Sequence, residues 1–213
     1  MTPKDATATR ERILDSAADL FNQRGYWGTS LSDLLAATGL EKGGLYHHFG
    51  SKEALALEAF DHAVDRLRVR IRESLAPHRE AVPRLHAAID NYVAFVERPP
   101  VAGGCPLLNT AVESDDTHPA LRERAAAAMT ELVDDTFGRI LTRGVERGEL
   151  AADLDVEGTA ALFVAAIEGG IMLSKLYGDN DYMRRTARRL HDLADSLATA
   201  GTGGTRTRRR SSR

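Results

Sequence analysis

The chain has 213 residues, with 43% hydrophobic and 28% charged side chains, an ordinary composition for a globular protein. Its net charge of −3 excludes DNA binding through an overall basic surface, so a DNA reader would need a local contact face. The single cysteine excludes an intramolecular disulfide and a multi-cysteine zinc site, and the polar N-terminal residues predict no signal peptide, which together favour a cytoplasmic protein.

The sequence lacks the usual signatures of an enzyme. It contains no HExxH, no nucleophile elbow and no phosphate loop, and no pairing of histidines with carboxylates stands out from helix surfaces. We therefore expect no enzymatic activity, no cofactor and no metal.

An amphipathic helix is predicted from about Arg12 to Phe21, and two short helices follow it. Ser30 can cap the first short helix, with Asp33 three residues later completing a capping box. Gly39 suits the left-handed residue that ends this helix. The spacing predicts a tight turn before the next helix.

The second short helix is predicted from about Glu41. Leu45 and Phe49 are four residues apart, so both should face the core. The other side then combines an ammonium, a phenol, two imidazoles and two glycines, groups that suit phosphates and base edges. Ser51 and Lys52 open a third helix, whose free N–H groups could hold a phosphate.

Residues 12–53 resemble the N-terminal domain of TetR-family (tetracycline-repressor-like) transcriptional regulators. The resemblance rests on the first helix, Gly-Tyr, Thr-Ser, Thr-Gly-Leu, Leu-Tyr-His-His-Phe and Ser-Lys-Glu. It implies that the helix from about Glu41 to His48 enters the major groove. Contacts with base edges are implied for Lys42, Gly43 and His47. Contacts with phosphates are implied for Thr29, Tyr46, His48 and Lys52.

Gly44 departs from the family pattern, which often has Ser or Thr at this position. A side-chain phosphate contact is lost there, or the backbone N–H replaces it. Three alternatives stay open on this helix. Tyr46 could be a packing residue with a solvated hydroxyl, the two glycines could simply loosen the helix, and His47 with His48 could bind a metal, although adjacent helical residues point in different directions.

The rest of the chain is predicted to be helical, which makes the fold all-α. We expect an N-terminal three-helix helix-turn-helix domain over residues 1–52 and a C-terminal helical domain for ligand binding and dimerisation over 53–198. Further helices are predicted at about 51–75, 85–96, 106–113, 118–148, 159–173 and 181–198. Residues 199–213 hold five arginines and no acid, and are predicted to be a disordered tail that either touches phosphates or only aids solubility.

A ligand cavity is expected between the C-terminal helices, because successive helices supply large apolar side chains. The predicted lining is Tyr92, Phe95, Leu107, Leu108, Met129, Phe137, Phe163, Ile167 and Met172, together with Cys105 and Glu168. Glu168 is alone in an apolar helix, so it should pair with an arginine across a dimer or meet a polar group of the ligand. Cys105 lies near a helix start, which would lower its pKa for reaction with electrophiles, unless it is a small buried hydrophobic residue.

The last two helices carry the features of a dimer interface. The helix at 159–173 is apolar all round and, at about fifteen residues, too short to span a membrane, so one face can pack on its own core and another on a second subunit. The last helix has a coiled-coil-like seam formed by Met183, Ala187, Leu190, Ala194 and Leu197. The resemblance implies that these two helices form the four-helix bundle of a homodimer.

The expected function is that of a ligand-responsive transcriptional regulator, most often a repressor in such a family. A homodimer would bind a palindromic operator in double-stranded DNA, and a small-molecule effector would release it. Two alternatives remain: a regulator that senses electrophiles or oxidants through Cys105, and a ligand-binding adaptor whose DNA binding has degenerated.

Overall fold

A computed structural model describes residues 3–199 and confirms the all-α prediction. Apart from one antiparallel bridge between Leu150 and Ala198, the described residues form helices and the loops that join them. The elements are α1 (Pro3–Gly28), α2 (Leu31–Thr38), α3 (Lys42–Phe49), α4 (Lys52–Leu75), α5 (Ala81–Glu97), α6 (Pro106–Ser114), α7 (Pro119–Thr130), the π-helical segment η1 (Glu131–Gly138), α8 (Arg139–Glu146), α9 (Val156–Tyr177) and α10 (Asp181–Ser196).

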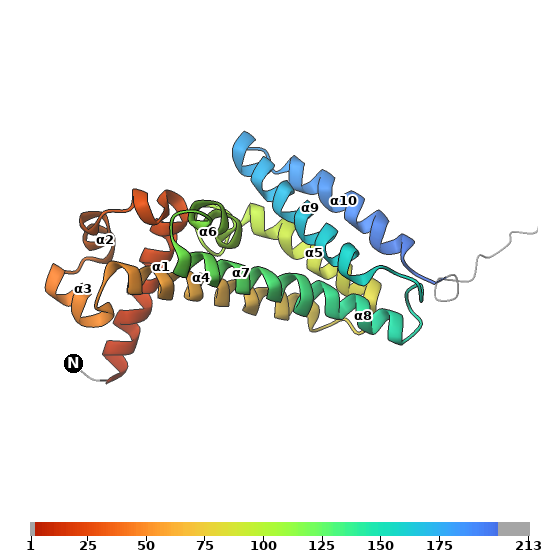
Figure 1. Ribbon diagram of the computed structural model, residues 1–213, viewed down its shortest axis with the longest axis horizontal. Coiled ribbons are helices and arrows are strands. Elements are labelled where there is room, and N and C mark those ends of the chain that lie inside the picture. Colours follow the sequence, from red (N-terminus) through yellow and green to blue (C-terminus); the bar gives the residue numbers. More distant parts are fainter. Residues whose placement is uncertain (1–2, 200–213) are drawn as a thin grey trace, which may run out of the picture.

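The N-terminal domain is built by α1, α2, α3 and the first half of α4 (Figure 1). The predicted capping box is confirmed: Ser30 Oγ accepts from the Asp33 N–H at 3.1 Å, and the Asp33 carboxylate accepts from the Ser30 N–H at 2.8 Å. Gly39 ends α2 with a φ of 68°, so α3 can turn away from α2. These short-range contacts fix the angle between the two short helices.

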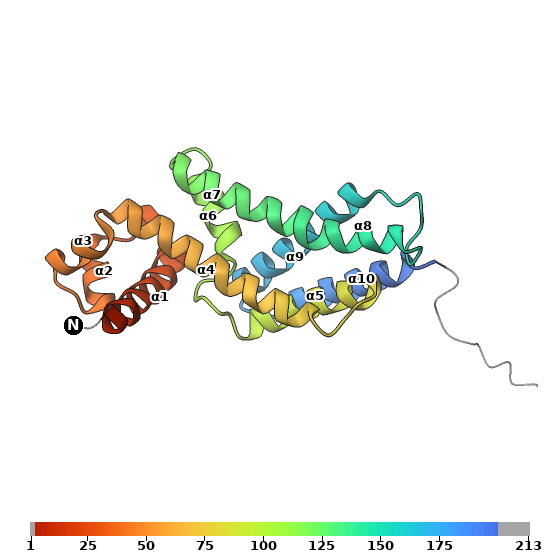
Figure 2. The same ribbon diagram turned by 90° about the horizontal axis from the view of Figure 1, so that it is seen from below.

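The C-terminal domain packs α5 against α4, α8, α9 and α10. Figure 2 shows η1 and α8 continuing the line of α7. The helix α4 belongs to both domains, because Leu55 and Ala59 lie in the N-terminal core whereas Phe60 and Val64 lie in the C-terminal core. Movement of α4 therefore affects both regions.

Two helices differ in form from the prediction. The segment expected as one helix over 118–148 contains the π-helical turns of η1, which loosen its backbone. The helix expected over 159–173 is the 22-residue α9, which is long and apolar enough to cross a membrane by length and composition alone. The predicted length of about fifteen residues was therefore wrong. However, Phe163 and Ile167 on one face of α9 are completely buried, as in the core helix of a folded domain.

The seam of α10 is not available as a dimer interface, which corrects the prediction for the last helix. Its apolar residues Met183, Ala187, Leu190 and Ala194 are buried within the subunit, and Leu197 packs against the same core. The periodicity identified an apolar face correctly, but α5 and α9 of the same chain cover it.

Thr199, the first residue of the predicted tail, is held in place. Its hydroxyl donates to the Gly148 carbonyl at 2.9 Å, and its N–H donates to the Glu149 carbonyl at 3.0 Å. Residues 200–213, which make up the rest of the predicted tail, lie outside the described residues.

Candidate functional site

The outward face of α3 presents most of the predicted DNA-contacting residues. Leu45 and Phe49 are buried, as predicted, which turns Lys42, Gly43, Tyr46 and His47 towards the outside. The Lys42 ammonium lies 6.0 Å from the centre of the Tyr46 ring, so a cation and a phenol share one patch.

Two other predicted contacts, Gly44 and His48, are half-buried at the edge of this face. Around Gly43 there is nothing within 4 Å of an added Cβ, and around Gly44 the nearest atom is Leu40 Cδ2 at 3.9 Å. Open space beside both glycines lets a DNA backbone approach closely.

Thr29 does not join this face, which corrects its predicted role as a phosphate contact. Its exposed fraction is 0%, and its hydroxyl donates to the Gly25 carbonyl at 2.6 Å. The side chain is needed there because Gly25, with a φ of 76°, breaks the regular hydrogen bonding of α1.

Lys52 is half-buried and supports the end of α1. Its ammonium donates to the Tyr26 carbonyl at 2.6 Å and lies 4.1 Å from the centre of the Tyr26 ring. An ammonium has three donors, so the bond to Tyr26 leaves Lys52 further donors for a phosphate.

A carboxylate from the C-terminal domain holds the end of α1, a contact that the sequence did not reveal. Glu113 of α6 accepts from the Tyr26 N–H at 3.0 Å and from the Trp27 N–H at 3.1 Å. A Cβ on Gly25 would collide with this carboxylate, at 2.4 Å from Oε1. The positive φ therefore favours glycine at the break, and any side chain there would also displace the end of Glu113.

A second connection joins α1 to the loop before α6. The Asn22 amide donates to the carbonyls of Ala102 and Gly104, each at 2.8 Å, and the Asn109 amide donates to Asn22 Oδ1 at 2.8 Å. One of the acceptors, Gly104, immediately precedes Cys105, so these bonds connect the DNA-binding domain with the interior of the C-terminal domain.

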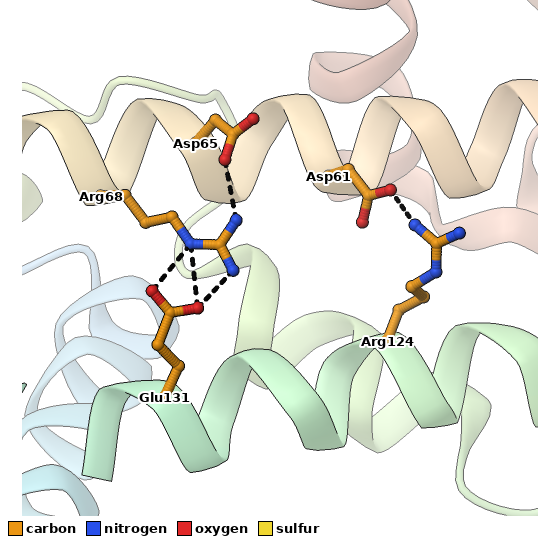
Figure 3. A network of polar contacts seen from close by, with 5 residues as sticks. All are labelled: Asp61, Asp65, Arg68, Arg124 and Glu131. Atoms are coloured by element: carbon orange, nitrogen blue, oxygen red, sulfur yellow. Dashed lines mark hydrogen bonds and ion pairs between the residues drawn. The ribbon is translucent and has the colours of Figure 1, made fainter. Parts of the chain in front are cut away.

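Ion pairs also join α4 to the line of α7 and η1 (Figure 3). Arg68 donates from Nε to both Glu131 oxygens at 3.1 Å and from Nη1 to Asp65 at 2.8 Å. Arg124 of α7 pairs with Asp61 of α4. All these groups are partly exposed, so the ion pairs add little to the stability of the fold. Their main effect is to fix the position of α4 relative to α7 and η1.

A cavity of about 750 Å³ lies between α4, α5, the η1–α8 segment and α9. This volume suits a drug-sized molecule. Of the predicted lining, the structure brings Tyr92, Phe95, Cys105, Leu107 and Glu168 to this cavity.

The other predicted lining residues lie elsewhere, which corrects that part of the prediction. Phe137 and Phe163 stack on each other in the core with 5.5 Å between ring centres, and Ile167 is fully buried beside them. Leu108 and Met129 are half-buried outside the cavity, and Met172 is exposed. The large apolar residues in the sequence therefore did not predict which side chains line the cavity.

The inner end of the cavity is a buried polar cluster. Glu168 has an exposed fraction of 6%, and its Oε1 accepts from Cys105 Sγ at 3.1 Å. Burial raises the pKa of Glu168 from 4.5 to about 7. Burial and the neighbouring Glu168 carboxyl raise the pKa of the Tyr92 phenol well above its ordinary value.

Cys105 is the N-cap residue of α6, as its predicted place near a helix start required, but its chemistry differs from the prediction. Burial, followed by the Glu168 carboxyl, raises the pKa of the thiol well above its ordinary value. The prediction of a lowered pKa was therefore wrong, because desolvation and a carboxyl group outweigh the helix N-terminus.

Comparison with known proteins identifies the family. Residues 13–59 match the family described as bacterial regulatory proteins, tetR family, and residues 81–190 match the tetracyclin repressor-like C-terminal domain. The chain belongs to the TetR family.

Relatives of this TetR-family chain cover nearly its whole length. An uncharacterised HTH-type transcriptional regulator of Mycobacterium tuberculosis is 31% identical, over 86% of this chain and 93% of its own length. A TetR transcriptional regulator from Chloroflexus aurantiacus is 42% identical, with a TM-score of 0.87, and 92% of this chain and 98% of that one are covered. A cysteine mutant of the TetR-family regulator CifR, solved with a 26-bp operator DNA, is 27% identical with a TM-score of 0.76, over 85% and 94% of the two chains.

Membership in the TetR family decides between the broad classes of function. TetR-family proteins are DNA-binding transcriptional regulators and not enzymes, so the helix-turn-helix of α2 and α3 is a DNA reader in this chain. An adaptor with degenerate DNA binding is thereby set aside.

Proposed function

We propose that the protein is a homodimeric repressor that binds a palindromic operator through α3 and is released by a small molecule in the cavity. The observation that carries the proposal is the path of α4. This helix begins beside α3, where Leu55 lies in the N-terminal core, and later presents Leu67 and Ile71 to the cavity. A ligand that displaces α4 would therefore move the reader.

On DNA, Lys42, Gly43 and His47 would meet base edges, and Tyr46 and His48 would hold phosphates. Their exposure or their place at the edge of one face of α3 supports this assignment. At Gly44 the backbone N–H would replace the side-chain contact common in the family. Solved CifR complexes with operator DNA show that a relative with the same fold binds DNA.

Dimerisation is assigned to the outer face of α9 in place of the buried seam of α10. Leu162, Met172 and Leu176 on this face have exposed fractions of 53%, 48% and 68%, and Ala165 and Gly169 between them are small. An apolar stripe at steps of three and four on a solvent-facing helix is typical of a helix-packing interface. The sequence had predicted that one face of this helix packs on a second subunit.

Coupling between ligand and operator would act through the ion pairs on α4. Arg68 both lines the cavity and pairs with Glu131, which is the first residue of η1. A ligand group that competes for Arg68 would loosen α4 from η1. By reciprocity, the operator would weaken ligand binding by the same factor.

The alternative of a Cys105 sensor is not favoured by the site, because the thiol is buried and its pKa is raised. The burial of Cys105 supports the other interpretation, a small residue of the hydrophobic core. Because a DNA-binding regulator has to reach its operator, we propose that the protein is cytoplasmic.

Selection of bound duplexes from random DNA tests the proposal. The expected result is a palindrome whose half-sites are about one helical turn, roughly 34–36 Å, apart, bound by a protein dimer. Recovery of no enriched sequence, or of a single half-site bound by a monomer, would contradict it.

A further inference from the structure

The buried end of the cavity contains an acceptor without a donor. Glu168 lines the cavity, and its Oε1 is occupied by the Cys105 thiol. Its Oε2 has less than 1 Å² of accessible surface and no hydrogen-bond partner in the part of the chain that the structure describes. A buried carboxylate oxygen left without a donor is costly, so a donor from a bound molecule would be strongly favoured.

The opposite end of the cavity has an excess of positive charge. Arg79, Arg84, Arg143 and Arg147 line it where α8 ends and α5 begins. Glu149 pairs with Arg147 at 3.5 Å and is the acidic side chain at this end among the described lining residues. Burial, and repulsion from Arg143 and Arg147, lower the pKa of Arg84, as expected where cations outnumber their counter-ions.

The remaining acids of the cavity already have partners. Glu131 pairs with Arg68, and Asp135 pairs with Arg139. Neither Arg79 nor Arg143 makes a side-chain ion pair within the described residues. The arginine end can therefore accept an anion without first losing an internal partner at these two positions.

An apolar stretch separates the two ends. Leu67, Ile71 and Leu75 of α4 line this stretch together with Leu132 and Ile140, and on α4 they alternate with Arg68 and Arg72. Along α5, Arg84 at one end and Tyr92 at the other are eight residues apart, which corresponds to about 12 Å of helix and to roughly the extended length of a ten-carbon chain.

We propose that the cavity binds an elongated apolar molecule with an anionic group at one end and a hydrogen-bond donor at the other. The anion lies among the arginines of α5 and α8, and the donor binds Glu168 Oε2. A purely apolar molecule would leave both ends unsatisfied, and a second anion at the inner end would face a carboxyl group. The assignment of this molecule as the effector rests on the proposed function, but its binding does not.

Three probes of equal chain length separate the two ends. Decanoate carries only the anion, 1,10-decanediol carries only hydroxyl donors, and 10-hydroxydecanoate carries both. Titration calorimetry on the full chain without DNA, at low salt, should show that 10-hydroxydecanoate binds about tenfold more tightly than either of the others, because each lacks one charge-assisted hydrogen bond.

Substitutions at Glu168 and at Arg143 test which group of the probe binds at each end of the cavity. Glu168→Met keeps the length of the side chain and removes the acceptor, so the preference for 10-hydroxydecanoate over decanoate should disappear or reverse. Glu168→Leu serves the same purpose if the methionine variant does not fold. Arg143→Gln should reduce the preference for 10-hydroxydecanoate over the diol at least threefold, whereas Arg122→Gln, on the exposed side of α7, should leave it unchanged.

Equal binding of the three probes, no binding of any of them, or a hydroxyl preference that survives in both Glu168 variants would overturn this ligand class. None of these results depends on DNA. Selection of a palindromic operator could still succeed in that case, so failure of the ligand class and failure of the proposed regulator are distinguishable.

Discussion

The buried carboxyl of Glu168 predicts a stability that depends on pH. In the folded chain its pKa is about 7, against 4.5 for an ordinary glutamate, so the folded state holds a proton that the unfolded state has released between these values. Stability is therefore lost as the pH rises from about 4.5 to 7, and the loss is complete above 7. The difference in pKa corresponds to about 3 kcal/mol of unfolding free energy.

Glu168→Met removes this group while it preserves the chain length and the helix propensity of the side chain. At pH 8 the variant should be about 3 kcal/mol more stable than the wild type, which corresponds to about 6–12 °C in Tm for a chain of this size. At pH 5 most of that advantage should disappear. Thermal unfolding followed by circular dichroism, at one fixed protein concentration, measures both differences.

The matched control is Glu123→Met on the exposed face of α7, which should change Tm little at either pH. A Glu168→Met advantage of the same size at pH 5 and pH 8 would refute the reasoning, because it would show that Glu168 does not titrate in this range. A variant less stable than the wild type at pH 8 would show that the carboxylate has a partner in the assembled protein.

Four further substitutions test other parts of the account. Tyr46→Phe should weaken operator binding about fivefold in a fluorescence anisotropy titration, because it removes one phosphate hydrogen bond; unchanged affinity would remove that role. Gly44→Ala should raise the unfolding free energy by up to about 1 kcal/mol, since the site has room for a methyl group, and a lower Tm would contradict this. Glu113→Gln should lower both Tm and operator affinity, because one amide oxygen replaces the two carboxylate oxygens that hold α1; full operator affinity would show that this contact does not position the reader. Leu162→Glu should convert the dimer to a folded monomer in sedimentation, and a stable dimer would exclude the outer face of α9.

Local sequence was sufficient to predict the ends of α2 and the inward face of α3 in the DNA reader. Ser30, Asp33 and Gly39 fix the ends of α2 through contacts of at most four residues, and Leu45 with Phe49 fixes the inward face of α3. Interactions of this kind are encoded in spacing, and the structure reproduces them.

Contacts between distant segments were not predictable in this way. The Glu113 carboxylate meets the Tyr26 N–H across 87 residues, and its surface position in α6 gave no sign of this role. Thr29 looked like a free hydroxyl, but the break at Gly25 turns it inward. No periodicity in the sequence reports such contacts.

An apolar periodicity also does not show whether the same chain or a second subunit covers the apolar face. The seam of α10 was assigned to a second subunit, yet α9 covers it from within the chain, where a Cβ on Gly170 would lie only 2.9 Å from the Met183 sulfur. The cavity was missed in part for a related reason. Its lining includes arginines such as Arg84 and Arg143, which a prediction based on large apolar side chains does not select.

The most direct test of the central claim is the operator dissociation constant, measured by anisotropy without ligand and then at saturating 10-hydroxydecanoate. If the ligand and the operator compete through α4, saturation should weaken operator binding about 5- to 150-fold, and Glu168→Met should require more ligand for the same effect. An operator affinity that stays the same when the cavity is saturated would contradict the claim.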